Sequence, residues 1–197
     1  MTAPIDLTRR LGEGWCVTVT PLDPALTLDM MGVRQPAEVP DGLAVASRRI
    51  PERLPEVLLL ARPAATGGGS VVLEVEGTLG WIGADPDMLG ELSEAGTACT
   101  INRDPNRVDV LIAEDGDVVA GLSAVTLRRW GDFTDGWNAA LADAGFPAGD
   151  EEPGDEISRW TPSQCAALAL AAVTGVTLDA GLLDGPWLGG LSAGAPA

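Results

Sequence analysis

The chain has 197 residues, 46% of them hydrophobic, and its 29 acidic and 12 basic residues give a formal net charge of −17. It contains no histidine, lysine or tyrosine, which excludes Ser-His-Asp and Cys-His catalysis, histidine-ligated metals and a lysine-dependent phosphate-binding loop. The negative charge disfavours nucleic acid and anionic membranes as partners. No apolar run reaches the length of a membrane span, and the N-terminal residues lack signal-peptide features, so we expect a cytoplasmic protein.

The first part of the chain predicts a strand, a short helix and an irregular stretch. Residues 15–20 alternate large apolar with small or polar side chains, which predicts a half-buried strand. Asp23, followed by proline, predicts the N-cap of a helix over residues 24–31. Residues 34–69 are rich in proline and glycine and are expected to be an irregular insertion, within which residues 57–61 are a candidate buried strand.

The central part predicts strands joined by tight turns. Residues 70–76 alternate so that Glu74 and Glu76 face away from the apolar side chains of the same strand. A second helix, capped by Asp85, is expected to end near Gly96, and a strand follows over residues 97–102. Two further strands flank an acidic turn that contains an Asp-Gly pair, which predicts a hairpin and not a calcium loop.

The last third predicts helices. A helix is expected over residues 135–144, with Asp135 as a good capping residue, and an acidic loop follows. Thr161 and Gln164 form a capping box for a helix that runs to Thr174, and a short helix is expected over residues 178–183.

Together these elements predict a single α+β domain with a mainly antiparallel sheet and helices packed on one face. Residues 1–11 are expected to be an N-terminal extension, residues 12–188 the domain, and residues 189–197 a flexible tail because they are small.

Several short motifs occur in an order that resembles a family of actinobacterial proteins known as a domain of unknown function, over residues 12–184. The resemblance implies a fold and a bacterial source and supplies no catalytic residues. One departure is that residues 100–103 lack the tryptophan of the family's Trp-Asn strand. The motifs are Trp15-Cys16, Gly77-x-Leu79-Gly80, Leu89-x-x-Leu92-Ser93-x-x-Gly96-Thr97, residues 113–119, residues 141–146, residues 166–170 and residues 174–178.

The sequence predicts neither a metal nor a cofactor. Cys16, Cys99 and Cys165 are widely spaced and odd in number, so buried structural thiols are the favoured interpretation. Carboxylates are the acid–base groups that remain, and no catalytic residue is assigned.

The candidate binding residues are aromatic and acidic. Asp132 and Asp135 lie beside Trp130 and Trp137, a pattern shared by sugar-binding clefts and by a helix start next to an aromatic cluster. Trp81 follows a glycine-rich turn and is expected to pack over the edge of the sheet or to line a ligand pocket.

Three functions remain open. The favoured hypothesis is a non-enzymatic acidic module that binds another protein of basic character, such as an immunity-like, antitoxin-like or assembly-adaptor protein. The second is a small-molecule or carbohydrate binder, or a hydrolase that uses Asp132 and Asp135. The third is a structural subunit of a homo-oligomer.

Overall fold

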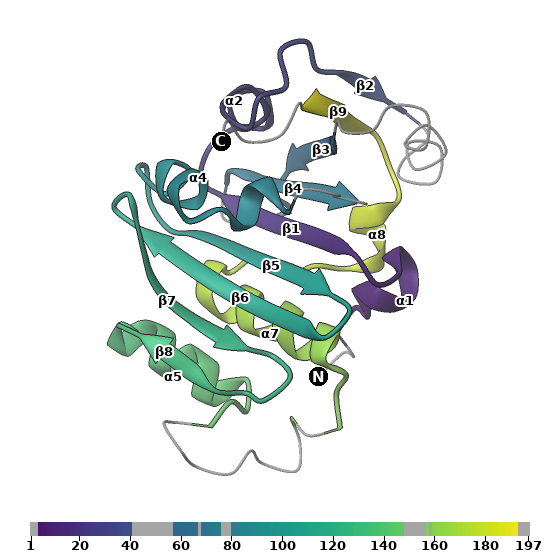
Figure 1. The fold of residues 1–197 in the computed structure, drawn as a ribbon. Coiled ribbons are helices and arrows are strands. Elements are labelled where there is room, and N and C mark those ends of the chain that lie inside the picture. Colours follow the sequence, from purple (N-terminus) through teal and green to yellow (C-terminus); the bar gives the residue numbers. More distant parts are fainter. Residues whose placement is uncertain are drawn as a thin grey trace.

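The computed structural model describes residues 4–40, 57–66, 68–75, 80–147, 157 and 159–192. In this part of the chain, nine strands form one sheet in the order β2-β9-β3-β4-β1-β5-β6-β7-β8, with antiparallel neighbours throughout (Figure 1). The predicted α+β class with a mainly antiparallel sheet is confirmed. The strands are β1 (Trp15–Thr20), β2 (Ala37–Val39), β3 (Val57–Pro63), β4 (Ser70–Val75), β5 (Ala98–Asp104), β6 (Arg107–Glu114), β7 (Asp117–Ser123), β8 (Arg129–Gly131) and β9 (Trp187–Ser192).

Two apolar clusters lie on opposite faces of the sheet. Successive residues of one strand enter different clusters, as Leu59 and Leu60 of β3 do. The larger cluster includes the apolar side chains of the longest described helices, which lie behind the sheet in Figure 1; the smaller cluster lies under short helices. The helices on the first face are α1 (Leu7–Leu11), α5 (Asp135–Asp143) and α7 (Pro162–Thr174). Those on the second are α2 (Pro24–Met30), the 3-10 turn η2 (Ile82–Ala84) and α4 (Pro86–Glu91), and α8 (Ala180–Leu183) precedes β9.

Strand β1 is buried along its whole length. The sequence predicted a half-buried strand, but both faces are covered, and all six of its residues are buried. Val17 and Val19 enter the larger cluster, whereas Thr18 and Thr20 face the other side and are 1% exposed. The alternating side chains of β1 therefore place apolar groups on one buried face and hydroxyl groups on the other.

The C-terminal strand corrects a predicted boundary. Residues 189–192 belong to β9 between β2 and β3, so the predicted flexible tail is wrong for these residues, and residues 193–197 lie outside the described part. The glycines are needed for packing: a Cβ on Gly189 would lie 2.5 Å from Leu60 Cδ2, and one on Gly190 would lie 2.5 Å from Val33 Cγ1. Small residues here allow close approach of neighbouring side chains.

The predicted extension and insertion both contribute to the domain. Within residues 1–11, Leu7 of α1 is fully buried and the N–H of Thr8 donates to Ser163 Oγ at 3.2 Å. Within residues 34–69, the candidate strand over residues 57–61 is confirmed as part of β3, and β2 is an edge strand of the described sheet. Residues 41–56 lie outside the described part of the chain.

Local capping and turn signals behave as predicted. Asp23 and Asp85 each accept backbone N–H groups at the start of α2 and α4, and Thr161 and Gln164 form the capping box of α7. The β6–β7 hairpin turns at Asp115 and Gly116, with φ of 53° and 92°. The helix expected to reach Gly96 ends earlier, at Glu91, and turns follow it.

Candidate functional site

The predicted site residues do not form one cleft. Trp137 is 8% exposed and belongs to the larger apolar cluster, so it is a core residue. Trp81 precedes η2, where its Nε1 donates to Asp104 Oδ1 at 3.1 Å and its ring packs beside Gly14. Trp81 thus packs on the sheet at the end of β5, while Trp130 belongs to β8 at the sheet edge.

Trp130 is a half-exposed aromatic residue on an edge strand. Its side chain is 51% exposed, and its ring covers Gly121 so closely that a Cβ there would lie 2.5 Å from the ring. Ala120 and Leu122 enter the larger cluster, so Gly121 between them faces the opposite side, the side that carries α4. Within the described chain, β8 pairs with β7 alone and leaves its outer edge unpaired. Arg129 fixes this strand by donating to Asn138 Oδ1 and to the Phe146 carbonyl oxygen.

Asp132 and Asp135 are both exposed. The N–H of Asp132 donates to the Val119 carbonyl oxygen at 2.9 Å and ties the loop to β7. The prediction that Asp135 caps the helix is wrong: Thr134 is the N-cap, its Oγ1 accepts the N–H of Trp137, and Asp135 lies in the first turn of α5. A carboxylate in that turn stabilises the helix through the helix dipole.

An acidic end is formed by α4 with its following turn and by the β6–β7 turn, which lie together at the left of Figure 1. The two segments touch, because Ser93 Oγ accepts the N–H of Gly116 at 3.1 Å and a Cβ on Gly90 would lie 2.2 Å from the Gly116 carbonyl oxygen. Residues 82–102 and 108–127 contain no basic residue. The carboxylates of this acidic end are those of Asp85, Asp87, Glu91, Glu94, Glu114, Asp115 and Asp117.

Glu74 is a buried carboxylate, although the alternation of its strand predicts that it faces away from the apolar side chains. It is fully buried; its two oxygens accept the N–H groups of Ile82 at 2.8 Å and Gly83 at 2.7 Å, and it clamps η2 to the sheet. Burial raises its pKa to about 7, against the lowering effect of these two hydrogen bonds. The signal available was Val72, which shares the face of Glu74 and is apolar, as a buried face requires.

Hydroxyl groups and a thiol line the sheet next to Glu74. Cys16 is its cross-strand partner, and Thr100 Oγ1 lies 3.1 Å from Cys16 Sγ and 3.0 Å from Thr18 Oγ1. A Cβ on Gly83 would lie 2.1 Å from Thr18 Oγ1, so η2 approaches the sheet closely only because residue 83 is glycine. The side chains of this cluster are buried.

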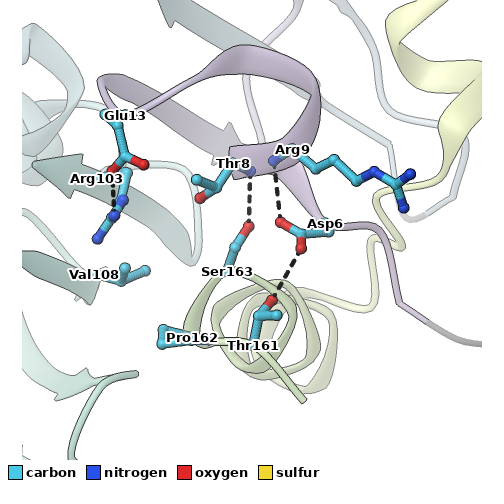
Figure 2. Close-up of a pocket in the computed structure, with 9 residues that line it drawn as sticks. All are labelled: Asp6, Thr8, Arg9, Glu13, Arg103, Val108, Thr161, Pro162 and Ser163. Carbon is cyan, nitrogen blue, oxygen red and sulfur yellow. Dashed lines mark hydrogen bonds and ion pairs between the residues drawn. The ribbon is translucent and has the colours of Figure 1, made fainter. Parts of the chain in front are cut away.

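A polar cavity of about 420 Å³ opens on the other face of the sheet (Figure 2). It lies where α1, the β5–β6 end of the sheet and the N-terminus of α7 meet. Asp6 caps α1 by accepting the N–H of Arg9, and it also accepts the hydroxyl of Thr161. Arg103 pairs with Glu13. The lining residues are Asp6, Thr8, Arg9, Glu13, Arg103, Val108, Thr161, Pro162 and Ser163.

The sequence patterns do not predict this cavity. They predict Thr161 as a helix cap and assign no functional role to Arg103 or to residues 7–11. The cavity joins residues 6–13, 103–108 and 161–163, and no sequence period connects these segments. None of the five predicted candidates lines it.

The three cysteines are free and buried, as predicted. Burial raises the pKa of Cys165 to about 11 and also raises the pKa values of Cys16 and Cys99. Among the described residues, no group of three or more Cys, Asp or Glu is arranged to hold a metal ion. None of the described helices has the length and apolar character to cross a membrane.

The structure defines an acidic α+β protein with a nine-stranded antiparallel sheet in the described part. It presents a half-exposed tryptophan on β8 and a polar cavity on the other face of the sheet. The chain belongs to the family of unknown function DUF6461, whose model matches residues 5–186. The resemblance seen in the sequence motifs is confirmed at the level of a family of unknown function. No curated protein and no solved structure matches the chain.

Proposed function

We propose that this protein is a non-enzymatic acidic module that binds a basic protein partner through Trp130 and the acidic end on the same side of the sheet. The observation that carries the proposal is the half-exposed ring of Trp130, held on Gly121 at a sheet edge that no other described strand pairs with. Tryptophan is enriched among the residues that dominate binding energy in protein interfaces. A ring that is already fixed in place loses little conformational entropy when a partner covers it.

The negative charge of this protein favours a basic partner. Trp130 faces the side of the sheet that carries α4, and the acidic end on that side has carboxylates but no basic residue in residues 82–102 and 108–127. A net charge of −17 speeds the approach of a basic partner and opposes the approach of an acidic one. We therefore favour a basic protein over a second copy of this chain, whose acidic end would repel its own counterpart.

The hydrolase hypothesis has less support. Asp132 and Asp135 are both exposed, Trp137 is buried in the core, and neither carboxylate lines the polar cavity. A carboxylate pair that catalyses glycoside hydrolysis flanks the bond it cleaves, inside a cleft. Small-molecule binding is a second candidate function, because the polar cavity on the α7 side has the size of a ligand pocket.

The test is capture followed by quantitative binding. The full chain is used as bait in a lysate of the organism that encodes it, and the retained protein is purified and titrated calorimetrically against wild type and variants. We expect a basic protein that binds one to one, with affinity reduced at least about tenfold by Trp130→Ala, equivalent to about 1.4 kcal/mol. Asp117→Asn should weaken the complex less and reduce its salt dependence.

Two control variants make the result specific. Leu26→Ala removes another exposed apolar side chain, 44% exposed on α2, and Asp143→Asn removes an exposed carboxylate on α5. Both should bind as wild type does. Equal affinity of Trp130→Ala and wild type, or a chain recovered without any stoichiometric partner, would contradict the proposal.

A further inference from the structure

We propose that the polar cavity between α1 and α7 binds a small oxyanion, a carboxylate or a phosphate group, with Arg103 as the anchoring residue. The site is separate from the surface assigned to the protein partner. Arg103 shares its strand face with Cys99 and Ile101, which belong to the larger apolar cluster, so it points to the α7 side of the sheet. Trp130 lies on the opposite side.

Arg103 has hydrogen-bonding capacity that the described protein does not use. Its side chain is 15% exposed, and its Nε is buried without any hydrogen-bond partner. A guanidinium presents five N–H donors in a planar fork that matches the oxygens of a carboxylate or a phosphate. A buried donor without an acceptor costs free energy, so the described residues leave Arg103 only partly satisfied. The exposed part of its guanidinium lines the cavity, where an oxyanion can accept from it.

Hydroxyl donors lie on the neighbouring wall. Ser163 Oγ accepts the N–H of Thr8, which leaves its own hydroxyl hydrogen to be donated. The Thr8 side chain extends toward the Arg103 side of the cavity in Figure 2. Val108, 1% exposed, supplies an apolar part of the wall.

The N-terminus of α7 faces the same space. Thr161, Pro162 and Ser163 are the N-cap and the first two residues of this 13-residue helix, and all three line the cavity. The positive end of a helix dipole favours a negative group placed there. This contribution adds to that of Arg103 and does not carry the site alone.

Two carboxylates also line the cavity, and they have different roles. Asp6 is committed to the fold, because it caps α1 and accepts the Thr161 hydroxyl. Glu13 is 67% exposed and holds Arg103 from the cavity rim. Its carboxylate forms an ion pair with the Arg103 guanidinium, as the oxyanion of a ligand would. Glu13 therefore competes with the ligand for Arg103.

The cavity suits an organic anion of modest size. Its volume of about 420 Å³ exceeds the needs of a bare ion, and Arg9 adds a second positive charge on the side away from Arg103 (Figure 2). With Arg9 and Arg103 against Asp6 and Glu13, the lining has no net charge, unlike the protein as a whole. A small metabolite with at least one carboxylate or phosphate therefore fits the site better than a polyanion, which the acidic protein would repel.

Because Glu13 competes with the ligand, removing its charge and removing that of Arg103 should change anion affinity in opposite directions. Succinate and inorganic phosphate are titrated separately into the full chain and followed by calorimetry and by two-dimensional NMR. We expect millimolar binding of at least one anion by wild type, about tenfold tighter binding by Glu13→Gln, and loss of binding by Arg103→Gln. Binding of succinate alone assigns a carboxylate site, and binding of phosphate alone assigns a phosphate site.

Matched controls separate the cavity from surface charge. Arg107→Gln removes the same charge from the neighbouring strand, where the side chain is 72% exposed and pairs with Asp109, and it should bind as wild type does. Glu38→Gln, an exposed carboxylate on β2, should not tighten binding. If Arg103→Gln fails to fold, Thr8→Val replaces it, with weakened binding expected and a folded thermal transition as its check. The proposal is overturned if neither anion binds wild type or Glu13→Gln at about 20 mM, or if Arg103→Gln and Arg107→Gln behave alike.

Discussion

Replacing Glu74 by glutamine should remove most of one pH-dependent step in the stability of this protein. Glu74 is fully buried, and its pKa is raised from 4.5 to about 7 by burial. Each pKa unit corresponds to about 1.4 kcal/mol, so the ionised carboxyl lowers the free energy of unfolding by about 3 kcal/mol relative to the protonated one. A pKa raised on folding means that the folded state binds the proton more tightly than the unfolded chain. The stability associated with the protonated Glu74 carboxyl is therefore complete below pH 4.5, falls between pH 4.5 and 7, and is lost above pH 7.

Glutamine at position 74 keeps the shape of the side chain but cannot titrate. Its carbonyl oxygen can accept one of the two N–H groups from Ile82 and Gly83, while its NH₂ group faces the other, so a constant loss of about 1–3 kcal/mol is expected at acidic pH. Near pH 8 the wild type carries the buried charge, and the difference between the two proteins should shrink or reverse.

Urea unfolding followed by tryptophan fluorescence measures this effect. Wild type and Glu74→Gln are compared at pH 4.5, 5.5, 6.5, 7.5 and 8.5, and their difference in free energy of unfolding is plotted against pH. The other carboxylates are common to both proteins and cancel in the difference. The expected curve changes by about 3 kcal/mol, mostly between pH 4.5 and 7. Glu91→Gln, which removes an exposed carboxylate on α4, serves as the surface control. A Glu74→Gln difference that does not vary with pH would refute the reasoning.

Three further predictions follow from the packing. Gly83→Ala should lower the free energy of unfolding by about 1–3 kcal/mol in the same urea assay, because its Cβ would lie 2.1 Å from Thr18 Oγ1 and η2 would have to move; an unchanged unfolding midpoint would contradict the close contact of η2 with the sheet. Deletion from residue 187 onward removes β9 from between β2 and β3, and we expect a loss of the cooperative thermal transition in circular dichroism; an unaltered transition would show that β9 adds nothing to the domain. Cys16, Cys99 and Cys165 should not react with a thiol reagent in the native protein and should all react in denaturant, since burial keeps them protonated and inaccessible; rapid native labelling of one of them would contradict its burial.

The parts of the fold that sequence reasoning predicted depend on neighbouring residues. The caps at Asp23 and Asp85 and the hairpin at Asp115 and Gly116 are set by groups within a few residues of each other, and these features are as expected. Thr134 was missed as the cap of α5 because Asp135 next to it has equal capping chemistry, and only the backbone conformation distinguishes the two.

The features that sequence reasoning missed depend on distant segments. The environment of Glu74 is decided by η2, which covers the second face of β4, and an alternating strand by itself does not show whether that face is covered. The small residues of β9 are predicted to be a tail because small size alone does not indicate burial. In the structure these glycines allow close packing against Leu60 and Val33, which are far away in the chain. The cavity is likewise assembled from three separate segments, and each of its residues has an ordinary local explanation.

The two proposed surfaces lie on opposite faces of the sheet, and β5 presents side chains to both faces. Its side chains alternate, so Arg103 lines the cavity on the α7 side, while Asp104 next to it holds Trp81 on the other. An anion that orders Arg103 would act on the end of this strand and not on Trp130, which lies three strands away in the sheet order. We therefore expect the two binding events to be independent within a factor of about two. Anion affinity should be unchanged in Trp130→Ala, and partner affinity unchanged in Arg103→Gln. A change of more than about fivefold in either measurement would show that the sheet couples the faces, and would make the anion a regulator of partner binding.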